Sequence, residues 1–157
     1  MVGRGPIDDD GPVTARRLIF RIGWAIHRAM WRLSGHRIGT APAGPDGVGT
    51  LFLLSTGRRS GAIRRNGLYY VEDGASFAVV ASNAGDDADP QWWRNLQATP
   101  ASTIELGATA VAVRAREATD GERDRIWPRF VAKYPVFADY RSRTTRAIPV
   151  VILEPRG

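Results

Sequence analysis

Apolar segments that follow one another closely between residues 50 and 81 constrain the fold most strongly. The segments 50–56, 68–71 and 77–81 have the length and apolar character of strands, and the stretches between them leave no room for crossover helices. Parallel strands need such crossovers, so we expect antiparallel pairing. Three more strands are expected, over 103–106, 111–116 and 149–153. About six short strands with two or three helices predict a mainly β, α+β fold, a small barrel decorated with helices.

Turn and cap residues place the first hairpin and the first helix of this barrel. Asp73-Gly74 is a typical hairpin turn, and Gly107-Ala108 is expected to join the strands at 103–106 and 111–116. Asp89 followed by Pro90 resembles an N-cap and first helical residue, which predicts a short helix through Gln97.

Two adjacent tryptophans, Trp92 and Trp93, lie on this predicted helix. Neighbouring side chains on a helix point about 100° apart. We therefore expect only one of the two rings in the core.

A second helical region is expected after residue 118. Thr119 and Glu122 have the spacing of a capping box, and Pro128 is expected to end or kink the helix that it opens. A further helix is predicted over 136–143. Tyr134, Phe137 and Tyr140 recur near this point, which indicates either core packing or the wall of a pocket.

The N-terminal part of the sequence differs from the barrel in composition. Residues 1–12 predict a flexible tail without the features of a signal peptide, and residues 39–49 form a Gly/Pro linker. Between them, residues 13–34 predict an amphipathic helix whose arginine-rich face also carries Phe20, Trp24 and Trp31. This helix is expected either to pack on the barrel or to lie on anionic lipid. The expected organisation is residues 1–45 as tail, helix and linker, and residues 46–157 as the barrel domain.

Composition excludes several classes of active site. The chain has no cysteine and only two histidines, His27 and His36, which excludes thiolate chemistry and a multi-histidine metal site. It also has no nucleophile elbow, no dinucleotide-binding glycine motif and no phosphate loop of the NTPase type. The net charge is +6, and all but one of the 22 basic residues are arginines, which indicates an anionic partner.

Two segments have the chemistry to bind such a partner. Residues 56–66 place four arginines and two hydroxyls around Gly57 and Gly61, which suits an anion site, although a basic hairpin loop in water has the same composition. Residues 81–96 run from a strand through small residues into a helix, where a planar ring and an anion can approach the backbone. The alternative for the second segment is a capped surface helix.

These segments, in this order, resemble the deazaflavin-dependent nitroreductases and quinone reductases of actinobacteria. The similarity covers roughly residues 50–155 and keeps its spacing throughout. Its motifs are 53–61, 80–83, 89–96, Pro100, Trp127-Pro128, Tyr134-Pro135 and 148–155. The resemblance implies a split β-barrel of the FMN-binding, pyridoxine-phosphate-oxidase-like type. It also implies coenzyme F420, a deazaflavin with a phosphate and an oligoglutamate tail.

The resemblance also implies site residues. The tail and phosphate would be lined by Arg58, Arg59, Ser60, Arg64 and Asn66, and the ring and ribityl chain by Val80, Ala81, Ser82, Asn83, Gln91 and Asn95. Ser82, Tyr134 and Tyr140 are the expected catalytic residues, with both tyrosines at the substrate. Members of the family often have Lys where Asn83 stands and Tyr where Phe137 stands, so the substrate stays open.

The implied function is hydride transfer from reduced F420 to a quinone or another electron-poor acceptor, with nitroaromatic reduction incidental. The expected location is the cytoplasm, peripheral at the inner face of the cell membrane, with residues 13–34 on anionic lipid and Trp24 or Trp31 able to cover the coenzyme. Nucleic acid is not an expected partner, because the arginines do not form one stripe, and the oligomeric state is open. The alternatives are an FMN-binding oxidoreductase on the same barrel and a non-enzymatic basic domain that binds membranes or nucleic acid.

Overall fold

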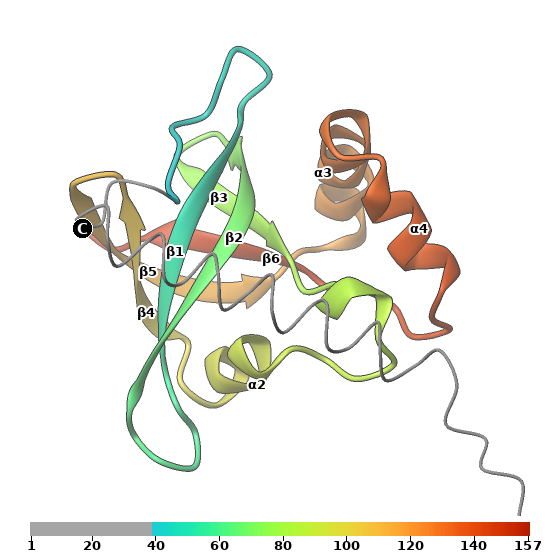
Figure 1. Cartoon of the computed structure of the whole chain (residues 1–157). Coiled ribbons are helices and arrows are strands. Elements are labelled where there is room, and N and C mark those ends of the chain that lie inside the picture. Colours follow the sequence, from blue (N-terminus) through green and yellow to red (C-terminus); the bar gives the residue numbers. More distant parts are fainter. Residues whose placement is uncertain (1–38) are drawn as a thin grey trace, which may run out of the picture. The chain divides into compact units, whose positions relative to one another are not determined.

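The computed structural model describes residues 39–157, and the tail and helix expected over residues 1–34 lie outside them. The described residues form a closed six-stranded antiparallel barrel in the order β1-β2-β3-β6-β5-β4 (Figure 1). Its strands are β1 (Val48–Thr56), β2 (Ile63–Asp73), β3 (Ser76–Val80), β4 (Ala101–Leu106), β5 (Thr109–Glu117) and β6 (Val150–Pro155). The expected barrel with helical decoration is confirmed.

The β1–β2 hairpin is longer than its apolar pattern predicts. β2 begins at Ile63 rather than at Leu68, because it pairs with the whole length of β1, from Thr56↔Ile63 to Val48↔Val71. Backbone hydrogen bonding therefore continues through polar residues that the hydrophobic pattern leaves out. As a consequence, Arg64 and Asn66 lie on a strand.

Alternate residues of the strands fill the barrel. Leu51, Leu53 and Tyr70 are almost fully buried in the interior, as the period of two along a strand requires. The Tyr70 hydroxyl accepts a hydrogen bond from the Ala43 backbone N–H at 2.9 Å, and Ala41 pairs with Thr50. The segment before β1 is thus attached to the barrel wall.

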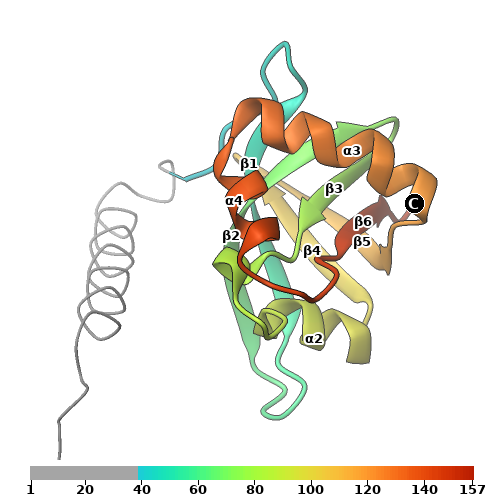
Figure 2. The ribbon, with the colours of Figure 1, turned by 90° about the vertical axis from the view of Figure 1, so that its right-hand side faces the viewer.

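The helix α3 (Asp120–Lys133) and the helix α4 (Val136–Ser142) cover the outer face of the barrel near β3 and β6 (Figure 2). Ile126 and Phe130 of α3 and Phe137 of α4 pack on this face. The predicted capping box of α3 is present, since the side chains of Thr119 and Glu122 each bond the other's backbone N–H.

Pro128 does not end α3, so the first of the two expected effects of this proline, ending or kinking the helix, is wrong. The helix continues through it to Lys133. Proline removes one helical hydrogen bond, and burial of Ile126 and Phe130 on either side offsets that loss. Tyr134 then caps α3, so Tyr134 and Tyr140 belong to different segments rather than to one helix.

The helix α2 (Gln91–Ala98) corrects two further predictions. Trp92 and Trp93 are both buried, with 6% and 4% exposure, and both belong to the interior cluster. The prediction of one buried ring is wrong because barrel residues pack against α2 over a wide face, so that both tryptophan rings are covered although they point in different directions. Asp89 is also not the N-cap: Pro90 holds that position, and the Asp89 carboxylate pairs with Arg146 at 2.9 Å.

The ion pair at the start of α3 predicts an acid-sensitive contribution to stability. Hydrogen bonds from Arg116, and then from the Thr119 backbone, lower the pKa of Glu122 to about 2. A lowered carboxyl pKa stabilises the fold above the unfolded value of 4.5, and the contribution disappears as the pH falls toward 2. We expect Glu122→Gln, which can still complete the capping box, to lose less stability than the wild type across this window.

Urea unfolding at pH 5, 4, 3 and 2.5 measures this difference. Asp124→Asn is the control, because this exposed carboxyl lies on the same helix and has no ion pair within residues 39–157. If the free energy of unfolding falls with pH equally in wild type and Glu122→Gln, Glu122 is not the source of the acid sensitivity.

Candidate functional site

The loop between β1 and β2 is fastened to α2 by Arg58. Its guanidinium donates to the side-chain oxygens of Gln91 at 2.8 Å and Asn95 at 3.3 Å, and its backbone N–H also donates to Asn95 at 3.2 Å. Asn95 is buried, and its amide nitrogen donates to Ser55 at 3.3 Å. These neutral partners fix the position of Arg58 without neutralising its charge.

Strand alternation separates the arginines of this hairpin. Arg65 forms an ion pair with Glu105 and stacks over the Phe52 ring at 4.2 Å. Arg64 points to the other face of β2 and donates to the Ser60 hydroxyl at 3.4 Å. Among the described residues, no carboxylate forms an ion pair with Arg58, Arg59 or Arg64. Three cations therefore gather at one loop without an acidic partner.

The turn of this loop depends on its glycines. A Cβ at Gly57 would stand 2.8 Å from the Ser60 hydroxyl and 3.1 Å from the Ala62 carbonyl oxygen. Gly61 has a φ of 68°, which L side chains rarely adopt. Glycine at these two positions thus allows the close backbone approach at residue 57 and the left-handed conformation at residue 61 that the turn requires.

The segment after β3 forms a tight loop against α4. Asn83 and Ala84 have positive φ values of 47° and 56°, and the Asn83 side chain donates to the Ala88 carbonyl at 2.9 Å. A Cβ added at Gly85 would lie 3.0 Å from the Tyr140 carbonyl oxygen, so the backbones approach closely. This contact brings the predicted Ser82 and Asn83 segment beside the helix of Tyr140.

An aromatic cluster stands between β2, α3 and α4. The Tyr69 and Tyr134 rings stack with centroids 4.1 Å apart, and Phe137 lies 6.4 Å from each of them and 5.6 Å from Tyr140. Phe137 is buried, whereas Tyr69 is 44% exposed. Burial, and then the neighbouring Tyr69, raises the pKa of Tyr134.

Sequence analysis missed Tyr69 and Ser55. Tyr69 follows from alternation, since its neighbour Tyr70 occupies the barrel interior and leaves Tyr69 on the outer face. Ser55 carries no such signal, because a small polar residue in an apolar strand indicates a buried hydrogen bond only once its partner Asn95 is known.

Of the other residues expected at the deazaflavin ring, some have buried side chains and some have exposed ones. Val80 packs in the cluster under α3 and α4, and Ala81 packs in the barrel interior. Gln91 and Asn83 are exposed, and Ser82 is partly exposed. The side chains of Val80 and Ala81 thus serve the core, and only their backbone can face a ligand.

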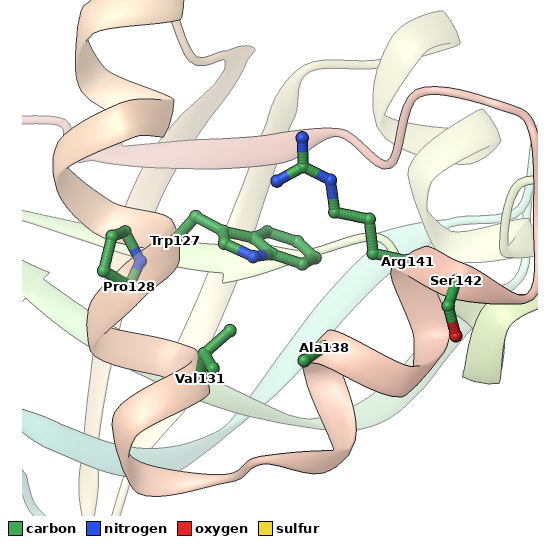
Figure 3. Close-up of a pocket in the computed structure, with 6 residues that line it drawn as sticks. All are labelled: Trp127, Pro128, Val131, Ala138, Arg141 and Ser142. Atoms are coloured by element: carbon green, nitrogen blue, oxygen red, sulfur yellow. The ribbon is translucent and has the colours of Figure 1, made fainter.

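A separate shallow groove of about 480 Å³ lies between α3 and α4 (Figure 3). Its lining residues are Trp127, Pro128, Val131, Ala138, Arg141 and Ser142, and the Arg141 guanidinium stands 5.9 Å from the Trp127 ring. None of the expected site residues lines it.

Within residues 39–157, no helix combines the length and the apolar character needed to cross a membrane.

Comparison with known proteins identifies relatives of this barrel. A putative F420H(2)-dependent quinone reductase of Mycobacterium tuberculosis is 43% identical over 109 residues, which is 69% of this chain and 92% of the relative. Another F420H(2)-dependent quinone reductase of that species is 34% identical over 142 residues, covering 88% of this chain and 91% of the relative.

Solved structures agree with these sequence relatives. An F420-H2 dependent reductase is 36% identical with a TM-score of 0.61, covering 67% of this chain and 93% of that chain. A putative pyridoxamine 5'-phosphate oxidase of Listeria innocua shares the fold, with a TM-score of 0.52 at 10% identity over 69% of this chain and 84% of that chain. The model of the F420H(2)-dependent quinone reductase family matches residues 24–155. The chain therefore belongs to the F420H(2)-dependent quinone reductase family and is an F420-dependent oxidoreductase.

Proposed function

We propose that this chain transfers a hydride from reduced F420 to a quinone. The site would run from the arginine loop, which is the β1–β2 turn with Arg58 and Arg59 together with Arg64 of β2, to the aromatic cluster. The observation that supports this proposal is a series of contacts and chain connections between two ends. Arg58 donates to Gln91 at the start of α2, the 81–89 loop leads into that helix, and the Gly85 backbone in this loop closely approaches the backbone of Tyr140. This series connects a cationic end with an aromatic end, as a cofactor with an anionic tail and a planar ring requires.

The residues present fit such a coenzyme. Arg58, Arg59 and Arg64 are cations without carboxylate partners among the described residues, and guanidinium groups match phosphate and carboxylate geometry. In our proposal these three residues, with Ser60 and Asn66, hold the phosphate and the tail. Gln91 and Asn95 orient Arg58, and the 80–83 segment lies along the ring.

The acceptor end would be formed by hydroxyl groups. When bound, the reduced deazaflavin supplies two electrons as a hydride. Tyr134 and Tyr140 would donate hydrogen bonds from their phenol hydroxyls to the quinone oxygen as it gains negative charge. Ser82, at the strand end opposite them, would orient the ring and the acceptor.

A binding experiment separates this function from its nearest alternative, an FMN-binding oxidoreductase on the same barrel. The purified chain is mixed with oxidised F420 or with FMN, and absorbance and fluorescence are followed. Saturable binding of F420 with weak or no binding of FMN supports the proposal, whereas preference for FMN overturns it.

The sequence of residues 13–34 supports a peripheral role at the inner face of the membrane. Arginines interleaved with Trp24 and Trp31 suit an interface of anionic lipid, where each basic residue contributes about 1 kcal/mol. We expect the full chain to sediment with vesicles of anionic lipid in a salt-sensitive manner, and much less with neutral vesicles. The double variant Trp24→Ala, Trp31→Ala should sediment less. Equal sedimentation with both vesicle types would refute a role for the arginines, equal sedimentation by both proteins would refute a role for the two tryptophans, and no sedimentation with anionic vesicles would refute membrane contact.

A further inference from the structure

Arg146 lies between α4 and β6 and joins that segment to the loop after β3. Its guanidinium donates to the carbonyl oxygens of Ala81 at 3.0 Å, Ser82 at 2.9 Å and Asp86 at 2.9 Å. It also pairs with the Asp89 carboxylate at 2.9 Å, and its side chain is only 16% exposed. The two connecting segments run side by side in both ribbon views (Figures 1 and 2). One side chain thus binds the 81–89 loop at four points.

The contacts with Ala81 and Ser82 fix two consecutive peptide groups. A peptide group is planar and trans, so its N–H points opposite to its C=O. Because Arg146 holds these two carbonyls, the N–H groups of Ser82 and Asn83 point away from Arg146. Within residues 39–157 neither N–H has a hydrogen-bond acceptor. The Arg146 guanidinium, together with the Gly85 N–H that also donates to the Ser82 carbonyl at 2.9 Å, therefore holds the two peptide groups whose N–H donors this loop presents.

The loop needs such an anchor because its backbone is unfavourable. Asn83 and Ala84 are in the left-handed region, which costs of order 1 kcal/mol or more for each residue that is not glycine. Strained residues persist only where surrounding contacts determine them. Charge-assisted hydrogen bonds from Arg146 supply these contacts on both sides of the strained pair.

We propose that Arg146 is a positioning residue for coenzyme binding, which holds the Ala81–Asp89 loop in the conformation that receives the deazaflavin ring. This inference rests on the proposed function of the loop. Arg146 acts through the loop, since its donors are engaged by the carbonyl oxygens and by Asp89. A planar fork is required to bind two adjacent carbonyls and Asp89 together, and a lysine ammonium provides only part of that geometry.

The test compares Arg146→Gln and Arg146→Lys with wild type by fluorescence titration with oxidised F420. We expect the Kd to rise about tenfold or more in Arg146→Gln and less in Arg146→Lys, with the KM for menadione little changed. Arg114→Gln, which makes the same charge change at an exposed position on β5, is the matched control and should bind as wild type does.

A purely structural role predicts another pattern. In that case the midpoint temperature of thermal unfolding falls while the Kd of the folded protein for F420 stays at the wild-type value. This result overturns the inference. Should Arg146→Gln fail to fold, Arg146→Lys decides the question, and an unchanged Kd in that variant also overturns it.

Hydrogen exchange without coenzyme gives an independent readout. We expect faster exchange in Arg146→Lys at the amides of Gly85 and Asp86, which donate to the carbonyl oxygens of Ser82 and Asn83, whereas unchanged exchange contradicts the positioning role. Failure of the proposed function is distinguishable, because then wild type itself does not bind F420. Wild-type binding together with unchanged affinity in both Arg146 variants rejects only the positioning role.

Discussion

Replacing Tyr134 with phenylalanine is expected to lower quinone turnover by about 10²–10⁴-fold while leaving the affinity for F420 unchanged. A quinone oxygen gains negative charge as the carbonyl is reduced, and a donor aimed at that oxygen stabilises the transition state more than the ground state. Tyr134 is suited to this task because its phenol hydroxyl is a hydrogen-bond donor and its ring is held by stacking on Tyr69. Its ring would stay in place, since stacking on Tyr69 does not involve the hydroxyl.

Tyr140→Phe is expected to act in the same direction, and Ser82→Ala to reduce both turnover and coenzyme affinity moderately. Tyr70→Phe is the matched control, because it removes a phenol hydroxyl that accepts a hydrogen bond from Ala43 inside the barrel. Stopped-flow oxidation of the reduced coenzyme by menaquinone analogues measures the rates. Wild-type rates in both Tyr134→Phe and Tyr140→Phe would mean that these tyrosines only pack α3 and α4.

The second large effect is expected at the arginine loop. Alanine at Arg58, Arg59 or Arg64 should each weaken F420 binding by about 1–3 kcal/mol, typical of a charge-assisted hydrogen bond. The triple variant should show the largest loss, and raising the salt concentration should weaken wild-type binding more than binding by the triple variant. The reason is that these cations have no carboxylate partner among the described residues, so an anionic tail would supply one.

Fluorescence titration at two salt concentrations tests this expectation. Arg114→Ala on β5 removes an equal charge outside the loop and should leave the affinity near that of wild type. An unchanged Kd in all three single variants and in the triple variant would refute a role for this loop in binding the tail.

Local patterns predicted those parts of the fold that local physics determines. Closely spaced apolar segments and turn residues located the strands, and the Thr119 and Glu122 spacing located the start of α3. The pattern failed where tertiary contacts override local preference. Pro128 lies inside α3 because buried neighbours hold that helix, and Asp89 pairs with Arg146 instead of capping α2.

The sequence predicted which segments form the candidate site, but not the contacts that join these segments. The glycine-flanked arginines and the small residues at 81–85 are visible as motifs, and the family resemblance gave them roles. The contacts that join them are long-range: Arg146 and Ala81 are 65 residues apart, and Arg58 and Asn95 are 37 apart. Such pairs follow from strand pairing between distant parts of the chain: β1 pairs with β4, which follows α2, and β3 pairs with β6, which follows the Arg146 segment. No local spacing indicates them.

The most direct test of the account is a stopped-flow experiment in which wild-type chain loaded with reduced F420 is mixed with a menaquinone analogue under anaerobic conditions. The absorbance of oxidised F420 reports electron transfer, and nitroaromatic compounds serve as a second acceptor. We expect saturable oxidation of the coenzyme by the quinone, at a rate that depends on enzyme concentration and falls in Tyr134→Phe. Absence of oxidation by any quinone, although the chain binds F420, would contradict it.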